Sequence, residues 1–343
     1  EIALDSYGGY ELSWYLGREI FDFNTLICED ITLTANWTFL EENIKTLLPD
    51  ETFDNITLPN IINTNNGIIK ISWKTSDENT LSKTGVTNPA RCDTKVILTL
   101  TMNLNDFVIN HEIPIIVKAI SFESLTGKQA TFGYFFSNMS NYKGLTETAA
   151  SALDVINYSF ARCTEDGVVS ISGLTKIPEV LQARKQGVRV VLCIGGYGAV
   201  NKTFSDAALT KEGREKFAQA VLDIIEKYHF DGVDIDWEYP GYETGRDTSV
   251  DRPNYTNLMY TIRKTLKSVN EDYLVTAAVP GGPWGNSRFD INNLNSILDY
   301  FHLMTYDFHN SSKVVHHTAL YSSSGTSTGC SVDSTVALFK SLG

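Results

Sequence analysis

The sequence predicts a multidomain protein in which an all-β sandwich precedes an α/β barrel, and three observations support this fold class. The chain has 343 residues, enough for more than one domain. Short β-like segments separated by Asn, Asp, Gly and Pro clusters fill residues 39–120, a rhythm typical of β-sandwiches. From residue 129 onward, strand-like and helical segments alternate, which indicates βαβ units and a parallel sheet.

Residues 1–38 form a separate, short segment rich in aromatic residues and threonine. Its end, Thr32–Trp37 (TLTANW), resembles the close of the small β-repeats of bacterial surface proteins. A β-rich linker explains the same residues equally well, because only one copy is visible. We therefore expect either a β-repeat remnant or a linker here.

Residues 39–120 begin with a helical pattern at Leu40–Leu48, followed by expected strands at Gly67–Trp73, Lys95–Leu104 and Asn110–Ile120. This rhythm, with the strand ISW at 71–73, resembles the immunoglobulin-like modules attached to bacterial extracellular carbohydrate-active enzymes, although a Cys…Trp…Cys pattern is missing. The resemblance implies a spacer first and a sugar-binding module second. Residues 121–128 are the expected linker to the barrel.

The barrel region spans residues 129–343 and contains helical patterns at Arg214–Tyr228 and Tyr255–Val269. Its expected strands are at 129–136, 155–160, 188–195, 232–239, 273–279 and 300–306. A TIM (β/α)₈ barrel has eight strands, so we expect a C-terminal continuation after the helical segment Asp333–Leu342. Without it, the edges at Thr131–Phe136 and Phe301–Tyr306 would be open to association and catalysis would be weak.

The stretch Phe230–Pro240 (FDGVDIDWEYP) carries the strongest functional signal. Apolar and acidic residues alternate from 233 to 238, so a strand sends the two sets to opposite faces. If the apolar set faces helices, the acids point into the barrel, with Glu238 nearest the C-terminal mouth where such barrels carry active sites. Repulsion among the acids raises at least one pKa, which would keep Glu238 protonated near neutral pH as an acid.

The spacing D-x-x-D-x-D-x-E over residues 231–238 resembles the signature of glycoside hydrolase family 18, the chitinases and their relatives. In that family the final Glu protonates the glycosidic oxygen, and the substrate's own acetamido oxygen attacks the sugar. The resemblance implies that Glu238 is the general acid/base, that Asp236 orients the acetamido N–H, and that Asp234 tunes Asp236. Asp231 is expected to be structural. The alternative explanations are an acidic strand at a loop edge or a metal site.

Other strand ends resemble the same family. The first strand contains Tyr134, and the third (VLCIGGY) resembles the family's Ser-x-Gly-Gly strand, with Cys193 in place of the usual serine. Gly196 belongs to the glycine pair that lets the backbone approach the acid strand. The resemblance places Tyr134 and Gly196 among the substrate-binding residues.

The sixth expected strand ends in M-x-Y-D, which resembles the second strong motif of the family. The resemblance implies that Tyr306 supports the acetamido group in catalysis and that Asp307 and Met304 bind substrate. Taken alone, such a pair is a buried tyrosine beside a capping aspartate. Trp284 and Tyr239 lie just past strand ends, where their rings would stack on sugar faces or only cover the barrel rim.

The charge and the composition of the chain limit the classes of molecule that it is expected to bind. The net charge of −13 argues against nucleic acid and anionic membranes, and a neutral carbohydrate fits it. No apolar run reaches membrane-spanning length, so we expect no membrane insertion. The five cysteines have no framework spacing, and we expect free thiols. The histidines, including His309, show no metal-ligand spacing, so neither a metal nor a cofactor is expected.

The chain does not begin with a signal peptide, and we expect a processed or excised piece of a longer protein. Family resemblance implies a secreted or cell-surface bacterial enzyme that hydrolyses β-1,4-linked N-acetylglucosamine. An endo-β-N-acetylglucosaminidase acting on N-glycans is the rival enzyme, since it shares the acid motif. A non-catalytic lectin, or an adhesin whose N-terminal modules matter most, are the rivals from another class.

Overall fold

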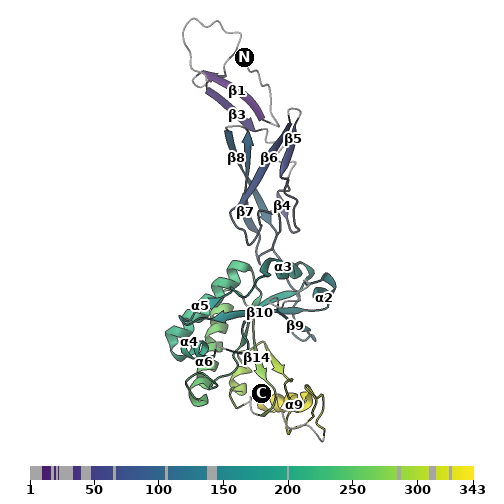
Figure 1. Cartoon of the computed structure of the whole chain (residues 1–343), viewed down its shortest axis with the longest axis vertical. Coiled ribbons are helices and arrows are strands. Elements are labelled where there is room, and N and C mark those ends of the chain that lie inside the picture. Colours follow the sequence, from purple (N-terminus) through teal and green to yellow (C-terminus); the bar gives the residue numbers. More distant parts are fainter. Residues whose placement is uncertain are drawn as a thin grey trace. The chain divides into compact units, whose positions relative to one another are not determined.

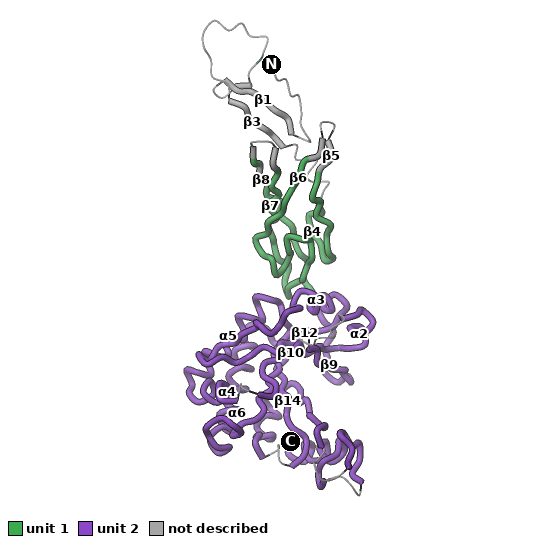
Figure 2. The backbone as a smooth tube through the Cα atoms, viewed as in Figure 1, with its two compact units in different colours: residues 1–120 green, residues 121–343 purple. Residues whose placement is uncertain are grey.

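The computed structural model describes residues 10–16, 19–20, 22, 34–39, 48–64, 67–104, 107–136, 145–198, 201–283, 287–308, 314–323 and 327–343. It divides the chain into two compact units, Glu1–Ile120 and Ser121–Gly343 (Figure 2). The expected helix at Leu40–Leu48 lies, apart from Leu48, outside the described residues. Trp284 and His309 lie outside them too.

The described strands of unit 1 form two sheets (Figure 1). The first has the antiparallel order β2-β1-β3, and the second has the order β4-β8-β7-β6-β5. The expected strands near residues 67, 95 and 110 are confirmed as β6, β7 and β8. The bounds are β1 Tyr10–Leu16, β2 Glu19–Ile20, β3 Thr34–Phe39, β4 Glu51–Thr52, β5 Ile61–Thr64, β6 Gly67–Thr75, β7 Thr94–Leu104 and β8 Phe107–Val117.

The core of unit 1 lies on one face of the larger sheet. Every second residue of β7 from Val96 to Met102 is fully buried, as period-two alternation requires. Residues outside the strands cover this face, among them Leu48 and Leu81. Leu81 also forms an isolated β-bridge with Thr87. Among the described residues this core has one sheet, so the immunoglobulin-like sandwich stays a prediction.

Unit 2 is built on a curled sheet whose parallel strands follow the order β9-β10-β12-β13-β14-β15. All six expected barrel strands are thereby confirmed. A short strand, β11, adds to the end of β10 in antiparallel fashion and was not expected. The bounds are β9 Phe132–Phe136, β10 Val155–Cys163, β11 Val169–Ser170, β12 Arg189–Gly195, β13 Gly232–Asp236, β14 Leu274–Pro280 and β15 Tyr300–Met304.

Helices connect these strands (Figure 1). The expected helices near residues 214, 255 and 333 are confirmed as α5, α6 and α9, and their N-caps Thr210, Asp247 and Ser331 each accept a hydrogen bond from a backbone N–H of the first turn. The bounds are α2 Glu147–Ser151, α3 Ile177–Leu181, η1 Gln182–Gln186, α4 Asn201–Leu209, α5 Lys211–Tyr228, α6 Thr248–Lys267, α8 Ile291–Leu294 and α9 Val332–Leu342.

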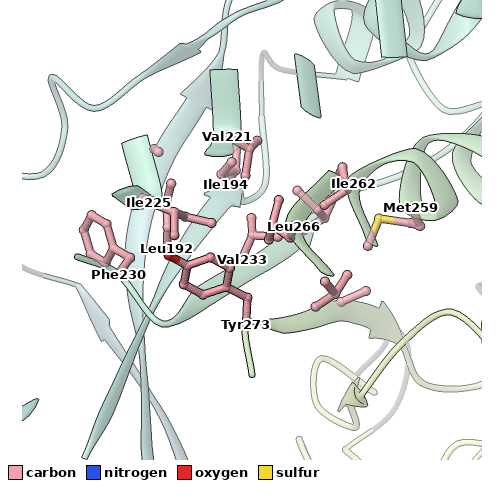
Figure 3. Packing of buried hydrophobic residues seen from close by; sticks show 14 of the residues in the cluster. Leu192, Ile194, Val221, Ile225, Phe230, Val233, Met259, Ile262, Leu266 and Tyr273 are labelled. Carbon is pink, nitrogen blue, oxygen red and sulfur yellow. The ribbon is translucent and has the colours of Figure 1, made fainter. Parts of the chain in front are cut away.

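The outward faces of the strands form the main core with the helices (Figure 3). Val233 on β13 belongs to this cluster together with Val221 of α5 and Ile262 of α6, and all three are fully buried. Trp237 stacks on Phe204 of α4 with ring centroids 5.6 Å apart. The apolar residues of the acid stretch therefore face the helices, as the alternation predicts, and the acids point the other way.

The floor of the barrel interior is apolar. Val155, Val191 and Leu274 point inward from three strands and pack with Leu125. Arg189 also donates a hydrogen bond of 2.8 Å to the carbonyl of Glu123. The expected linker 121–128 is therefore packed against unit 2 along residues 123–125, because its leucine closes the end of the sheet that would otherwise expose apolar side chains to water.

The two outer strands of this sheet approach each other through their side chains. Among the described strands, β9 pairs only with β10, and β15 pairs only with β14. The ring of Phe132 lies 4.7 Å from that of Tyr300 and 4.8 Å from that of His302. The curl of the sheet thus brings the first and sixth strands together around a shared interior.

Candidate active site

The base of the acid strand is anchored by an ion pair. Asp231 accepts two hydrogen bonds from Arg184, from Nε at 2.9 Å and from Nη2 at 3.1 Å, and both side chains are fully buried. Asp231 also accepts from the N–H of Val190 on β12. This network ties η1, β12 and β13 together, so the contacts of Asp231 are structural.

One layer higher, Asp234 is fully buried and surrounded by donors. Its Oδ2 accepts from the Tyr134 hydroxyl at 2.7 Å and from the Cys193 thiol at 3.1 Å, and its Oδ1 accepts from the Thr276 hydroxyl at 2.7 Å. Such donors compensate the desolvation of a carboxylate. The thiol of Cys193 therefore takes the place where the family's motif carries a serine hydroxyl, and Tyr134 reaches Asp234 from the first strand.

Asp236 ends β13 and is buried at the base of the cleft described below. Burial raises its pKa well above the ordinary value, repulsion by Glu238 and Asp234 adds to this, and Arg162 partly opposes it. The backbone of the neighbouring strand lies close here: a Cβ on Gly195 would stand 2.0 Å from the carbonyl oxygen of Asp236. A glycine is required at 195 for this approach.

Glu238 lies beyond the strand, because β13 ends at Asp236 and not at residue 239 as expected. Its side chain is half-buried at the mouth of the barrel. Its pKa is raised chiefly by burial and further by the charge of Asp307, against hydrogen bonds from Tyr239 and the Tyr197 backbone that lower it. The expected repulsion among the acids of this strand acts on Asp236, where Glu238 and Asp234 add to the effect of burial on its pKa.

The acids open into a cleft of about 730 Å³ at the C-terminal ends of the strands. Five aromatic rings and the single Pro-Gly-Gly-Pro segment 280–283 form most of its wall. The lining residues are Phe160, Tyr197, Asp236, Glu238, Tyr239, Pro280, Gly281, Gly282, Pro283, Met304, Tyr306, Asp307, Phe308, Ser327, Thr328 and Cys330.

The structure therefore brings most of the expected site residues together. Tyr239, Met304, Tyr306 and Asp307 share the cleft with the acids. Burial raises the pKa of Tyr306 to about 12, so its hydroxyl stays a proton donor at neutral pH. Met304 also fixes the cleft wall, since its carbonyl accepts from the N–H of Gly281 at 3.0 Å.

Tyr134 and Gly196 lie next to the cleft and not in its wall. The Tyr134 hydroxyl donates a hydrogen bond to Asp234, which lies below the other two acids, and so supports this carboxylate. The N–H of Gly196 donates to the Asp236 carbonyl at 2.9 Å, which links the third strand to the acid strand. Substrate binding by these two residues stays a prediction, and the described contacts show in addition that both support the acid strand.

Sequence reasoning missed several residues near the acids. Arg162 donates to the Gly195 carbonyl at 2.7 Å and lies over the ring of Phe160. The ring of His317 is stacked on Tyr306, and its Nδ1 lies 3.5 Å from Asp307. Arg162 lies near the C-terminal end of the second barrel strand, β10, and so carried a positional signal, whereas His317 lies in a loop that has no local pattern.

In the placed part of the chain, no three His, Cys, Asp or Glu side chains gather as a possible metal site. None of the helices described is both long and apolar enough to cross a bilayer.

Carboxylates layered in a parallel barrel sheet, with a protonatable glutamate at the mouth of an aromatic cleft, define the class of barrel glycoside hydrolases. The model of the family described as "Glycosyl hydrolases family 18" matches residues 131–343. The chain belongs to this family.

Known relatives agree with this assignment. Chitinase A1 of Niallia circulans is 33% identical over 147 residues, which cover 40% of this chain and 21% of the relative. Chitotriosidase-1 of Mus musculus is 30% identical over 175 residues, or 48% of this chain and 37% of the relative. The chain therefore spans less than half the length of these two relatives.

Solved structures with the same fold include two that are at least 30% identical. One is a family 18 N-acetylglucosaminidase from Paenibacillus barengoltzii, with 30% identity and a TM-score of 0.55, covering 63% of this chain and 65% of that one. The other is the chitinase domain of the spore coat protein CotE from Clostridium difficile, with 31% identity and a TM-score of 0.55, covering 66% of each chain.

Proposed function

We propose that this protein hydrolyses β-1,4 linkages between N-acetylglucosamine units of chitin or chito-oligosaccharides, with retention of configuration and with the substrate's acetamido group as nucleophile. The observation that carries the proposal is the state of Glu238: a half-buried carboxyl group with a raised pKa at the wall of the cleft, directly above a more deeply buried aspartate. A proton held there is available to a glycosidic oxygen.

In the proposed hydrolysis, three side chains have separate roles. Glu238 donates its proton to the glycosidic oxygen as the C1–O bond breaks, and the acetamido carbonyl oxygen bonds to C1 to give an oxazolinium ion. Asp236 accepts a hydrogen bond from the acetamido N–H, and its negative charge balances the positive charge of the oxazolinium ion. The Tyr306 hydroxyl donates to the acetamido oxygen. Water then attacks C1 as the bond between C1 and the acetamido oxygen breaks, and Glu238 takes a proton from this water, which restores both the acetamido group and the protonated glutamic acid.

The chain's own geometry supports these tasks for the aspartates. Asp234 accepts three hydrogen bonds, so its negative charge is stabilised in the interior. Asp236 has an Oδ1 that is buried without a hydrogen-bond partner among the described residues. An oxygen of this kind is suited to accept from an N–H that arrives with the substrate.

Hydrolysis of chitohexaose by the full chain tests the proposal, with products followed by ¹H NMR of the anomeric protons. We expect the β-anomer first, and we expect Glu238→Gln to lose at least about 100-fold in kcat while retaining oligosaccharide binding. The exposed Glu226→Gln on α5 is the matched control and should keep full activity. Unchanged turnover in Glu238→Gln would refute the assignment.

A second substrate arm separates the related activities. A high-mannose glycoprotein would be cleaved by an endo-β-N-acetylglucosaminidase and left intact by a chitinase. If the protein binds chitohexaose but cleaves neither substrate, it is a lectin on this fold. The presence of Glu238 in the cleft favours an enzyme.

We also infer that unit 1 is an immunoglobulin-like spacer and that the protein works outside a bacterial cell. The spacer is supported by the regular strands of residues 67–117 and by a core that this unit builds from its own residues. The location of the protein outside the cell is supported by the resemblance of its N-terminal modules to those of bacterial extracellular enzymes.

A further inference from the structure

His302 lies in the barrel interior at the level of Asp234. On β15 the inward positions alternate, with Tyr300 at the apolar floor, Met304 in the cleft wall, and His302 between them. The imidazole packs against the rings of Phe132 and Tyr134, with centroids 4.8 and 5.7 Å away. Its side chain is 13% exposed, and its Nε2 is buried with no hydrogen-bond partner among the described residues.

The charged group next to this nitrogen is Asp234. The Nε2 of His302 lies 3.7 Å from Asp234 Oδ1, too far for a good hydrogen bond but within the range of an ion pair. Among the described residues that oxygen accepts one hydrogen bond, from Thr276, whereas Oδ2 accepts two. A lone pair on Oδ1 is therefore left to face the imidazole.

The groups around His302 are few in kind. From β13 it faces Asp234, and from β9 it faces the hydroxyl-bearing ring of Tyr134. The residue paired with His302 on β14 is Ala278, which carries no charge. The thiol of Cys193 on β12 donates a hydrogen bond to the other oxygen of Asp234. A change of charge on His302 would therefore act first on Asp234.

We propose that His302 is a positioning residue that acts through Asp234: in acid it becomes a cation paired with this carboxylate, and so helps to keep Asp236 ionised above it. The proposal rests on the proposed function, in which an ionised Asp236 is needed to balance the acetamido group. His302 itself touches neither the cleft nor the substrate, since the cleft is lined by its neighbour Met304.

The charges give the direction of the effect. Burial lowers the pKa of His302 from its ordinary value of 6.5, and Asp234 works against that lowering. At neutral pH the imidazole is therefore uncharged, and Asp234 contributes to the raised pKa of Asp236. Once His302 takes up a proton, its charge offsets that of Asp234, so Asp236 is protonated only at lower pH. The acid limit of activity moves down with it.

The first test measures the ion pair without using catalysis. Histidine resonances of the full chain are titrated by NMR, and His302→Gln identifies the signal. In Asp234→Asn we expect the titration midpoint of His302 to fall by about one pH unit or more, because the opposite charge is lost. Circular dichroism confirms that each variant is folded. A midpoint that does not change between wild type and Asp234→Asn overturns the proposal.

The second test uses the pH profile of kcat on chitohexaose. In His302→Gln, and equally in His302→Phe, which keeps an aromatic ring in place, we expect the acid limb to move upward by about half a pH unit or more. His111→Gln in unit 1 is the control and should leave the limb in place. A merely structural part for His302 would lower kcat at all pH values without moving the limb.

The two tests separate this proposal from the one on which it rests. If the wild type hydrolyses no N-acetylglucosamine oligomer, the proposed function fails, and the NMR titration still decides on the ion pair. If hydrolysis is found but the acid limbs of His302→Gln and wild type coincide, the effect on Asp236 is refuted and the proposed function stands.

Discussion

Asp236 and Glu238 are two carboxyl groups on one strand end whose raised pKa values have different consequences. Burial is the largest cause of the raised pKa in both groups, but Asp236 is only 4% exposed, whereas Glu238 is half-buried. Solvent reaches Glu238, so it can exchange protons with water during a catalytic cycle. Ionisation of Asp236 instead destabilises the folded state, because the protein only partly compensates the loss of hydration of this buried carboxylate.

This cost predicts that Asp236→Asn is more stable than the wild type at neutral pH. Because the pKa of Asp236 is higher in the folded than in the unfolded chain, the folded state binds more protons between the two values, and stability falls as pH rises through that window. Asparagine has no such titration. We expect the variant to gain at least about 1 kcal/mol at pH 8, with the gain fading as the pH approaches 3.8.

Urea unfolding at pH 4 and pH 8, followed by tryptophan fluorescence, measures this difference. The exposed Asp223→Asn on α5 is the control and should show no pH-dependent gain. Equal stability of Asp236→Asn and wild type at pH 8 would contradict the stated origin of the raised pKa.

At the scale of elements, strands and helices were predictable and the wall of the cleft was not. The period of two in β7 and the apolar run of β12 are local signals, and burial on one or both faces follows from them. The cleft also takes Ser327, Thr328 and Cys330 from a loop, and such a loop has no period. A Cβ on Gly329 would lie 3.1 Å from Pro283, a contact that only the folded chain reveals.

The candidate site was predictable to the same extent. The position of Glu238 and Asp236 in the cleft was predictable, because alternation places the acids on the inner face and the strand direction places them at the mouth. The part played by Tyr134 under Asp234 spans 100 residues of sequence and depends on the curl of the sheet. The end of β13 at Asp236 was missed because Trp237 continues the alternation beyond the last strand pairing.

The buried pair at the base of β13 predicts a large loss when one partner is removed. Arg184→Met leaves the Asp231 carboxylate without its guanidinium in a fully buried position, and we expect a loss of about 3–5 kcal/mol in the free energy of unfolding. Asp231→Asn should cost a similar amount, whereas the double variant should cost less than the sum, because no unpaired charge remains.

Urea denaturation of the four chains forms the double-mutant cycle. The exposed pair of Lys211 and Glu215, 3.7 Å apart, provides the control: Lys211→Met should cost less than about 1 kcal/mol. Strict additivity of the Arg184 and Asp231 variants would show that the two charges do not depend on each other.

At the scale of the whole molecule, each of the two units has a core of its own. The core clusters of unit 2 take their residues from position 125 onward, and that of unit 1 takes its residues from Leu48 to Val117. The boundary at Ile120 falls before Leu125, which packs under the barrel. Residues 121–128 therefore belong to the stability of the catalytic unit, although their composition is that of a linker.

This arrangement predicts that two truncations eight residues apart behave differently. Removal of residues 1–120 leaves the floor of the barrel intact, so we expect the midpoint of urea unfolding and the kcat on chitohexaose to stay within about twofold of those of the full chain. Removal of residues 1–128 uncovers Val155, Val191 and Leu274. Loss of a fully buried leucine side chain costs about 2–5 kcal/mol, and because Leu125 is partly buried we expect a loss of about 1–2 kcal/mol.

Adsorption to insoluble chitin completes the comparison, because it separates a spacer from a sugar-binding module. A spacer predicts that the chain without residues 1–120 adsorbs as well as the full chain, whereas a sugar-binding unit 1 predicts weaker adsorption with unchanged turnover of soluble chitohexaose. Equal stability of the two truncated chains would show instead that Leu125 contributes little. The floor of the barrel would then be held by contacts among the strands alone.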